Sequence, residues 1–133
     1  MLSILLDTHI LVWWHSDSAR LAKAQARAIL EMESRGDPVA ISAITLWELA
    51  KMAGRGRVQT TGPLDLWIED LNSHPSMTVL PLTARIAAES FQLGDDFHRD
   101  PADQIIVATA RCHGLRLMTA DERIRRWGKV PVI

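Results

Sequence analysis

Short apolar runs alternate with helical segments along the chain, and this alternation predicts an α/β fold. The expected architecture is a central, mostly parallel sheet of four to five short strands, flanked by helices on both faces. The composition agrees, because 47% of the 133 residues are hydrophobic and the mean hydropathy is +0.02. No repeat or linker divides the sequence, so we expect residues 1–133 to form a single domain.

The strands are predicted from runs that are apolar throughout, as in parallel strands that are buried on both faces. These runs are residues 3–6, 38–41, 77–80 and 115–118, followed by a last apolar piece at 131–133. Each run is short and is bounded by a polar residue or a turn residue. We therefore expect four strands, with residues 131–133 as a possible fifth.

In the first half of the chain, helices are expected over residues 8–14, 19–34 and 43–52. Apolar residues in the second of these recur at three- and four-residue intervals, and Gly36 ends the pattern. Ser42 is a favourable N-cap for the third helix.

In the second half, helices are expected over residues 64–71, 83–94, 101–113 and up to Trp127. Asp100 is a favourable N-cap before Pro101, which suits the first turn of a helix because its missing N–H costs nothing there.

The composition also excludes several classes of protein. No apolar run approaches the ~18 residues of a membrane span. The apolar N-terminus lacks a basic leader and is interrupted by Asp7 and His9, so a signal peptide is not expected and the cytoplasm is the predicted location. Cys112 is the single cysteine, which rules out an internal disulfide framework.

Acidic residues occur where the predicted elements meet one edge of the sheet. Asp7 and Asp121 follow strands, and Glu48 and Asp103 lie near the starts of helices. In parallel α/β folds, ligands bind outside the carboxyl ends of strands. We therefore expect these four acids to share a pocket; the alternative is that they cap helices or face solvent.

Crowded carboxylates repel one another unless a cation compensates them. Oxygen ligands without a Cys/His set favour one or two Mg²⁺ or Mn²⁺ ions over zinc. Such a site can activate water and stabilise charge on a phosphodiester. The side chains expected to orient ligands or water from outside the metal's own shell are Thr8, Ser42, Asp100 and Thr119. Helix capping is the alternative for each of them, and it is the commoner role of such hydroxyl groups.

Basic side chains near these acids suggest a polyanionic substrate. The net charge is −1, and it would become +4 if the four acids and Asp100 were neutralised. The residues expected to contact such a substrate are Lys51, Arg55, Arg57, Arg123 and Arg126. The alternative is an ordinary solvated surface.

Four ordered motifs resemble those of PIN-domain ribonucleases, most closely the VapC-type toxins of bacterial type II toxin–antitoxin systems. The motifs are Leu6-Asp7-Thr8-His9 with Trp13-Trp14, Ser42-Ala43-Ile44-Thr45-Leu46-Trp47-Glu48-Leu49, His98-Arg99-Asp100-Pro101-Ala102-Asp103-Gln104, and Thr119-Ala120-Asp121. Together they extend over nearly the whole chain. The resemblance implies a single PIN-like nuclease domain.

The resemblance also implies an activity and partners. It implies an Mg²⁺- or Mn²⁺-dependent endoribonuclease in which Asp7, Glu48, Asp103 and Asp121 hold the metal and metal-activated water cleaves RNA. It further implies a homodimer and a cognate VapB-type antitoxin whose C-terminal segment covers the cleft. Two residues depart from the pattern: Ala102 stands where relatives often have an aromatic residue, and Gln104 where they often have arginine.

Two other functions are weighed against this one. The first is a catalytically idle RNA- or protein-binding module with the same fold, against which the four intact acids argue. The second is phosphoryl transfer with Asp7 as nucleophile. This second function is disfavoured because His9 replaces the second acid that such enzymes carry and no suitably placed lysine follows a strand.

Overall fold

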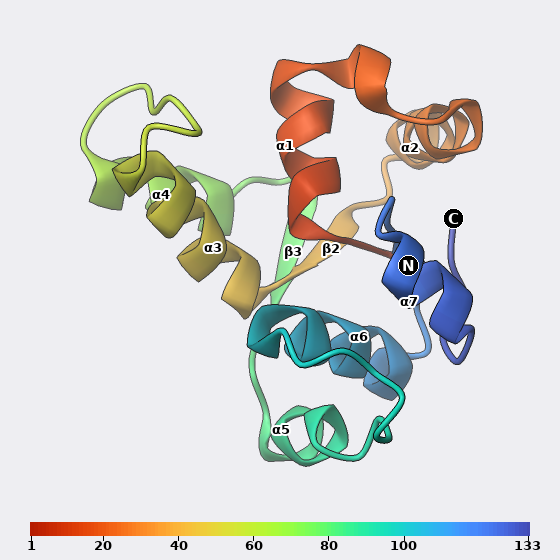
Figure 1. The fold of residues 1–133 in the computed structure, drawn as a ribbon. Helices are drawn as coiled ribbons and strands as arrows, with labels where there is room; N and C mark the ends of the chain where they lie inside the picture. The colour runs from red at the N-terminus through yellow and green to blue at the C-terminus, as the bar shows by residue number, and fades with distance from the viewer.

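Four strands form one parallel sheet in the order β3-β2-β1-β4 in the computed structural model, which describes residues 1–133 (Figure 1). The strands are β1 (Ile4–Leu6), β2 (Val39–Ser42), β3 (Met77–Leu80) and β4 (Arg116–Met118). Near the C-terminus, Val132 forms a single parallel bridge with Leu117 instead of a fifth strand. The predicted α/β fold is therefore confirmed.

Seven α-helices connect and cover these strands. They are α1 (Thr8–Ser16), α2 (Lys23–Arg35), α3 (Ala43–Gly54), α4 (Leu64–Asn72), α5 (Ala84–Ser90), α6 (Pro101–His113) and α7 (Glu122–Trp127). The longest, α2 and α6, have 13 residues each. None of the helices has the length and apolar character needed to cross a membrane.

Several helix boundaries differ from the sequence-based expectation. Helix α5 ends at Ser90 instead of residue 94, and α1 continues to Ser16 instead of residue 14. Helix α2 begins at Lys23 instead of residue 19, because Ser18–Arg20 form a separate 3-10 turn (η1) in which the Arg20 amide donates to the Asp17 carbonyl (3.1 Å). Helix α3 continues through Gly54. The expected boundaries came from the apolar pattern of the sequence. This pattern does not distinguish a 3-10 turn from an α-helix, and it does not show where a glycine continues a helix.

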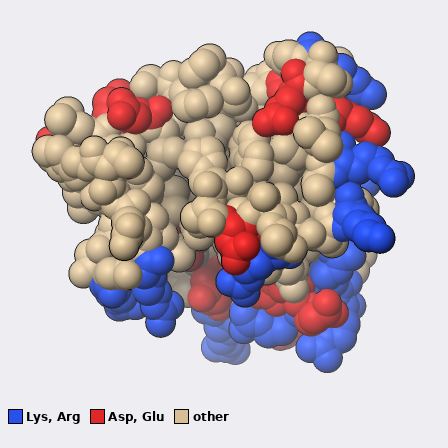
Figure 2. Space-filling model, turned by 90° about the horizontal axis from the view of Figure 1, so that it is seen from above, with Lys and Arg blue, Asp and Glu red and all other residues tan.

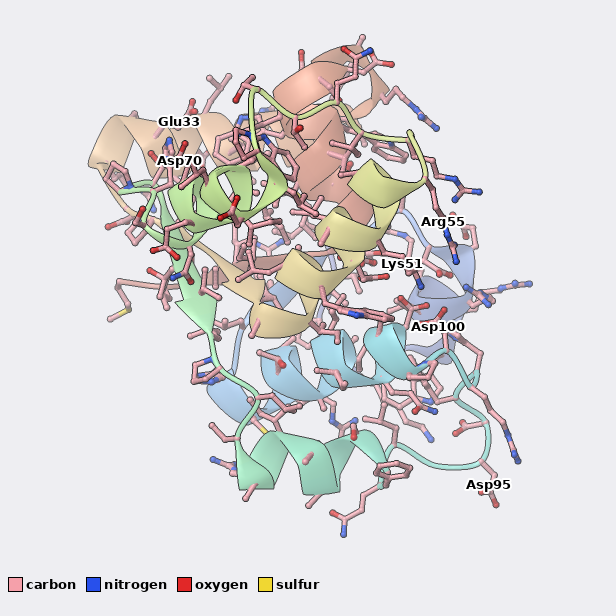
Figure 3. The ribbon with its side chains drawn as sticks, turned by 90° about the vertical axis from the view of Figure 1, so that its left-hand side faces the viewer. Glu33, Lys51, Arg55, Asp70, Asp95 and Asp100 are labelled. Carbon is pink, nitrogen blue, oxygen red and sulfur yellow. The ribbon has the colours of Figure 1, made fainter.

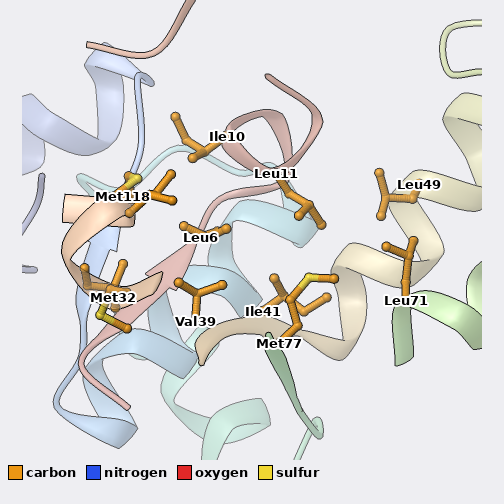
Figure 4. Close-up of a cluster of buried hydrophobic side chains, with 12 residues drawn as sticks. Leu6, Ile10, Leu11, Met32, Val39, Ile41, Leu49, Leu71, Met77 and Met118 are labelled. Carbon is orange, nitrogen blue, oxygen red and sulfur yellow. The ribbon is translucent and has the colours of Figure 1, made fainter. Parts of the chain in front are cut away.

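The sheet separates two hydrophobic clusters, because successive residues of a strand point to opposite faces. On β1, Ile4 and Leu6 pack against one cluster and Leu5 against the other. The first cluster, shown in Figure 4, also takes residues from α1, α2, α3 and α4. The second cluster is completed largely by α6 and α7. Both faces of the short strands are thus buried, as predicted.

The strand order places the two ends of the chain beside each other. The chain builds outwards from β1 to β2 and β3, and then returns to add β4 on the other side of β1. Gly114, with a φ of 64°, adopts the left-handed conformation that ends α6 just before β4. The residues that follow β1 and β4 are therefore neighbours at the carboxyl edge, which is where ligands bind in parallel sheets.

Candidate metal centre

Asp7 is the most deeply buried acid of the candidate site. It follows β1 and caps α1, and only 3% of its surface is exposed. Its Oδ1 accepts from the Thr8 amide (2.8 Å), and its Oδ2 accepts from the Thr119 hydroxyl (2.8 Å). The Asp7 amide also donates to the Met118 carbonyl (3.0 Å), which ties the residue to β4.

Burial raises the pKa of Asp7 from its ordinary 3.8 to about 6. The hydrogen bonds from Thr119 and Thr8 oppose this shift, while the negative charges of Asp121 and Asp100 add to it. Asp7 is therefore a buried carboxylate that the protein supplies with neutral donors but no close lysine or arginine.

Glu48 projects from α3 and meets the start of α1. The Thr8 hydroxyl donates to Glu48 Oε1 (2.6 Å) and lies 3.0 Å from the Thr45 hydroxyl. Because Thr8 has one hydroxyl proton, Thr45 is the donor in the second contact. Burial raises the pKa of Glu48, and the charges of Asp7 and Asp103 raise it further.

Asp103 lies in the first turn of α6 with 15% of its side chain exposed. Its Oδ2 is hydrogen-bonded to His98 Nε2 (2.7 Å), and its amide donates to the capping oxygen Asp100 Oδ1 (3.1 Å). Burial raises the pKa of Asp103 to about 6 despite the His98 hydrogen bond, and the negative charge of Asp7 contributes.

His98 is the first residue of the motif that contains Asp100 and Asp103, and the sequence did not predict a role for it. Its ring stacks on Phe97, with centroids 4.5 Å apart and planes at 25°. Gln104, the departure from the family pattern, donates from Nε2 to the His98 carbonyl (3.4 Å). In the sequence, His98 lies five residues before Asp103, but this spacing alone does not predict the contact between them. The contact depends on the path of the loop before α6.

Asp121 lies at the exposed side of the same group of acids. It caps α7, and its Oδ2 accepts from Arg123 Nη2 (2.9 Å), which also lies 3.6 Å from Asp103 Oδ2. Burial would raise the pKa of Asp121, but the hydrogen bonds and positive charge of Arg123 outweigh it and lower the pKa. Thr119 Oγ1 accepts from the Asp121 amide (3.0 Å) while donating to Asp7, so one hydroxyl links two of the acids.

The structure brings all four predicted acids to one edge of the sheet. Ligand atoms of His98, Asp103 and Asp121 lie within 4.8 Å of one another. The charges of Asp7 and Asp103 raise the pKa of Glu48, and the charge of Asp7 raises the pKa of Asp103. Because Asp7 and Glu48 have no lysine or arginine partner, the donor set fits a divalent cation that prefers oxygen ligands. The acids are thus a candidate divalent-metal site.

The side chains expected around the acids divide into two groups. Thr8 and Thr119 donate directly to Glu48 and Asp7. Ser42 accepts from the Ile44 amide (3.2 Å) at the start of α3, and Asp100 is exposed at the start of α6, so both act as helix caps.

His9 is a further neighbour that the sequence did not single out. Its Nε2 accepts from the Ala120 amide (2.9 Å), and its Nδ1 lies 3.6 Å from Asp7 Oδ2. Burial lowers the pKa of His9, although the surrounding acids oppose this. Its neutral ring joins the start of α1 to the segment after β4.

The predicted basic residues are exposed at the same edge. Figure 2 shows Lys and Arg side chains on both sides of acidic side chains along its lower edge. Lys51 lies over the Trp47 ring (4.4 Å), and Figure 3 places Lys51 and Arg55 on the same side of the molecule as Asp100. Arg57 is exposed in the loop after α3, and Arg123 and Arg126 are exposed on α7.

The family model of the PIN domain matches residues 4–130, which is nearly the whole chain. The chain belongs to the PIN-domain family. This PIN domain is 38% identical over 125 residues to Ribonuclease VapC22 of Mycobacterium tuberculosis, covering 94% of this chain and 92% of that protein.

Solved structures agree with the PIN fold. A toxin–antitoxin complex from Klebsiella pneumoniae contains a chain 26% identical to this PIN domain, with a TM-score of 0.64, covering 98% of this chain and 96% of that one. VapBC2 from Rickettsia felis, solved with a promoter DNA fragment, gives a TM-score of 0.72 at 16% identity and covers 100% and 98% of the two chains.

Proposed function

We propose that this PIN domain is an Mg²⁺- or Mn²⁺-dependent endoribonuclease and the toxin of a toxin–antitoxin pair. The observation that carries the proposal is the meeting of four acids from four separate segments at the carboxyl edge, where Asp7 and Asp103 have pKa values raised to about 6. Its likeness to Ribonuclease VapC22 over 94% of the chain supports the same activity.

Asp7, Glu48, Asp103 and Asp121 are the residues that would hold one or two metal ions. When bound, the metal supplies an activated water and neutralises the charge that develops on the scissile phosphate. Thr119 and Thr8 fix the orientation of Asp7 and Glu48 through their hydroxyl groups, and His98 fixes Asp103. Ser42 and Asp100 hold the helices that carry these acids.

RNA contact is assigned to the basic side chains on the two sides of the acids. Lys51, Arg55 and Arg57 lie beyond the end of α3, and Arg123 and Arg126 lie on α7. Their positive charge would attract the phosphate backbone, so RNA binding is expected to weaken as salt rises.

Partner binding is assigned to apolar surface away from the acids. A hollow of about 450 Å³ between α1, α3 and α4 is lined by Leu11, Leu49, Trp67 and Leu71 and by Arg57. We assign part of a VapB-type antitoxin to it, in addition to the C-terminal segment expected over the acids, so Arg57 is shared between RNA and antitoxin. Exposed apolar side chains elsewhere, including Trp47 (55% exposed) and Leu66 (59% exposed), support a homodimer. Function inside the cytoplasm follows from an RNA target and an antitoxin partner.

The test compares Asp7→Asn with Asp17→Asn. Asp17 is exposed and its side chain caps nothing, so its substitution controls for the loss of one negative charge. We expect wild type and Asp17→Asn to cleave RNA with Mn²⁺ and to arrest growth on expression, and Asp7→Asn to do neither while folding normally. Cleavage that survives both a chelator and Asp7→Asn would refute the metal mechanism.

An idle binding module predicts a different result. If the protein only binds, the wild type and the Asp7→Asn variant should bind RNA or a protein partner with the same affinity. Neither protein should then produce new RNA ends. Sequencing the 5′ ends of total cellular RNA after expression distinguishes the two functions and identifies the RNA that is cleaved.

A further inference from the structure

We propose that a hollow between the loop before α6 and helix α7 binds the RNA strand on one side of the cleaved phosphate, with Arg99 and Arg126 as its phosphate contacts. This proposal rests on the ribonuclease function proposed above. It adds a defined subsite, a residue that the sequence analysis did not select, and a direction for the strand to leave the metal site.

The hollow is open to solvent and has a volume of about 590 Å³. Its walls include the side chains of Phe97, His98 and Trp127 and the three arginines Arg99, Arg123 and Arg126. Arg99 belongs to the loop that leads into α6, whereas the other two arginines belong to α7. Two segments distant in sequence therefore supply the positive charge.

This hollow is continuous with the acids through two shared residues. His98 lines the hollow and is hydrogen-bonded to Asp103 (2.7 Å), and Arg123 lines the hollow and is paired with Asp121 (2.9 Å). A strand whose phosphate lies at the acids therefore meets the hollow immediately beyond them.

The charge of the hollow favours a polyanion. Arg99 and Arg126 lie farther than 4.0 Å from every carboxylate, so their charge is available to a ligand. Of the two acids that line the hollow, Asp96 is already paired with Lys129 Nζ (3.0 Å) and accepts from Trp127 Nε1 (3.2 Å). Only Asp95 is left to oppose the arginines.

Two of the aromatic residues that line the hollow pack against each other. Phe97 is buried and packs edge-on against Trp127, with centroids 4.9 Å apart and planes at 74°. Trp127 is also flanked by Lys129 (5.7 Å) and Arg111 (5.5 Å). A positively charged groove with aromatic side chains is the arrangement that binds single-stranded nucleic acid with little sequence preference.

The experiment compares a double variant, Arg99→Ala with Arg126→Ala, with a control that changes Arg27 and Arg35 to alanine. The control pair are exposed cations on α2 that do not line the hollow, so the control variant also loses two positive charges. Circular dichroism and thermal melting check that both variants fold. RNA binding is measured in an Asp7→Asn background by fluorescence anisotropy across a salt series, and cleavage is measured as kcat/KM.

With a single-stranded RNA that extends several nucleotides on both sides of the cleavage site, we expect the Arg99/Arg126 variant to lose about 10- to 100-fold in kcat/KM. The slope of log affinity against log salt should decrease by about 1.4, since each phosphate contact to a single strand contributes about 0.7. The control variant should match wild type in both measurements.

Trimming the RNA locates the contact. Shortening one flank to a single nucleotide should remove the penalty of the Arg99/Arg126 variant, while shortening the other flank should leave it. An equal penalty on every substrate, no penalty on any, or the same penalty in the control would overturn the subsite. Unchanged cleavage with weakened antitoxin binding would overturn it as well, by assigning the hollow to the protein partner.

Failure of the ribonuclease function gives a distinct result. If wild type and control cleave RNA and the Arg99/Arg126 variant equals them, the subsite alone is wrong. If wild type cleaves no RNA, the ribonuclease proposal is wrong, and the anisotropy series still tests the subsite because it measures binding without cleavage.

Discussion

Asp7 and Asp121 lie at opposite sides of the same acidic site and are stabilised in opposite ways. Asp7 is buried, accepts hydrogen bonds from neutral donors, and has a pKa raised to about 6. Asp121 lies at the surface, is paired with Arg123, and has a pKa below its usual value. Each also caps a helix, so their backbone positions are equivalent.

The difference shows where the protein leaves negative charge uncompensated. Arg123 neutralises the charge of Asp121, whereas no lysine or arginine of the chain is paired with Asp7. Burying an unpaired carboxylate is costly, and it is tolerated where a bound cation can repay the cost. The inner side of the site, comprising Asp7 and Glu48, is therefore where a metal should contribute the most.

The largest effect is expected from Asp7→Asn. Activity should fall by more than about 100-fold, because substitutions outside the ligand shell of a metal already cost 10- to 100-fold. In EDTA at pH 7.5 the same variant should melt at a higher temperature than wild type, since a neutral amide removes the buried charge. Asp121→Asn should not raise the melting temperature, because it breaks an ion pair at the surface; equal gains in both variants would abolish the distinction.

His98→Ala should lower activity by about 10- to 100-fold, because Asp103 loses the partner that orients it. A positioning role also predicts weaker Mn²⁺ binding, measured by isothermal titration calorimetry. His98→Gln, which retains a donor, should recover part of the affinity. Unchanged Mn²⁺ affinity in His98→Ala would show that the histidine acts on the substrate alone.

The stability of the metal-free protein should decrease as pH rises. In the folded protein Asp7 has a pKa of about 6 against an ordinary 3.8, so between these values the folded state binds more protons than the unfolded state. The contribution of Asp7 to the free energy of unfolding is therefore greatest below about pH 4. It falls by about 3 kcal/mol as the pH rises to 6 and above. Thermal melting in EDTA at pH 4.5, 5.5 and 7 measures the loss.

Metal should reverse that trend, because it binds the deprotonated acids and releases their protons. The rise in melting temperature on adding Mn²⁺ should be larger at pH 7 than at pH 5. A rise that is the same at both values would mean that the buried acids are not the ligands.

Thr119→Val should destabilise the protein by about 1–3 kcal/mol, because the hydroxyl is buried and links Asp7 to the Asp121 amide. Thr119→Ser keeps both hydrogen bonds and serves as the control. Chemical denaturation of the metal-free proteins gives the comparison, and a valine variant as stable as wild type would show that the link contributes nothing.

The smallest effect is expected from Asp100→Asn. Asparagine is as good an N-cap as aspartate, so α6 should keep its start and the enzyme most of its activity. Asp103→Asn, three residues along the same helix, should instead abolish cleavage. Equal inactivation of the two variants would place Asp100 among the metal ligands.

The fold and the location of the acids were predictable from sequence because they depend on local patterns. Apolar runs identify buried strands, and an acid directly after a strand must lie at its carboxyl end. Asp100 caps α6, as its place before Pro101 predicted. The assignment of Asp103 to the metal came from the resemblance to PIN domains and stays a prediction. The start of α2 was wrong by four residues, because η1 has the composition of a helix and ends before it.

What the sequence did not reveal are contacts between distant segments. Thr45 touches Thr8 across 37 residues, and Thr119 touches Asp7 across 112. The contact between His98 and Asp103 depends on the conformation of the loop before α6. These contacts depend on strand register and loop shape, so a sequence pattern can select Thr119 as a polar neighbour without indicating which atom it donates to.

The position of β4 beside β1 has a consequence for synthesis. Asp7 leaves the ribosome 112 residues before its hydrogen-bond partner Thr119, and β4 cannot pair with β1 until Arg116–Met118 have been synthesised. A nascent chain that ends at residue 110 carries three of the four acids and lacks the strand that brings the set together. The acidic site therefore assembles only after β4 and the segment that carries Thr119 and Asp121 have been synthesised.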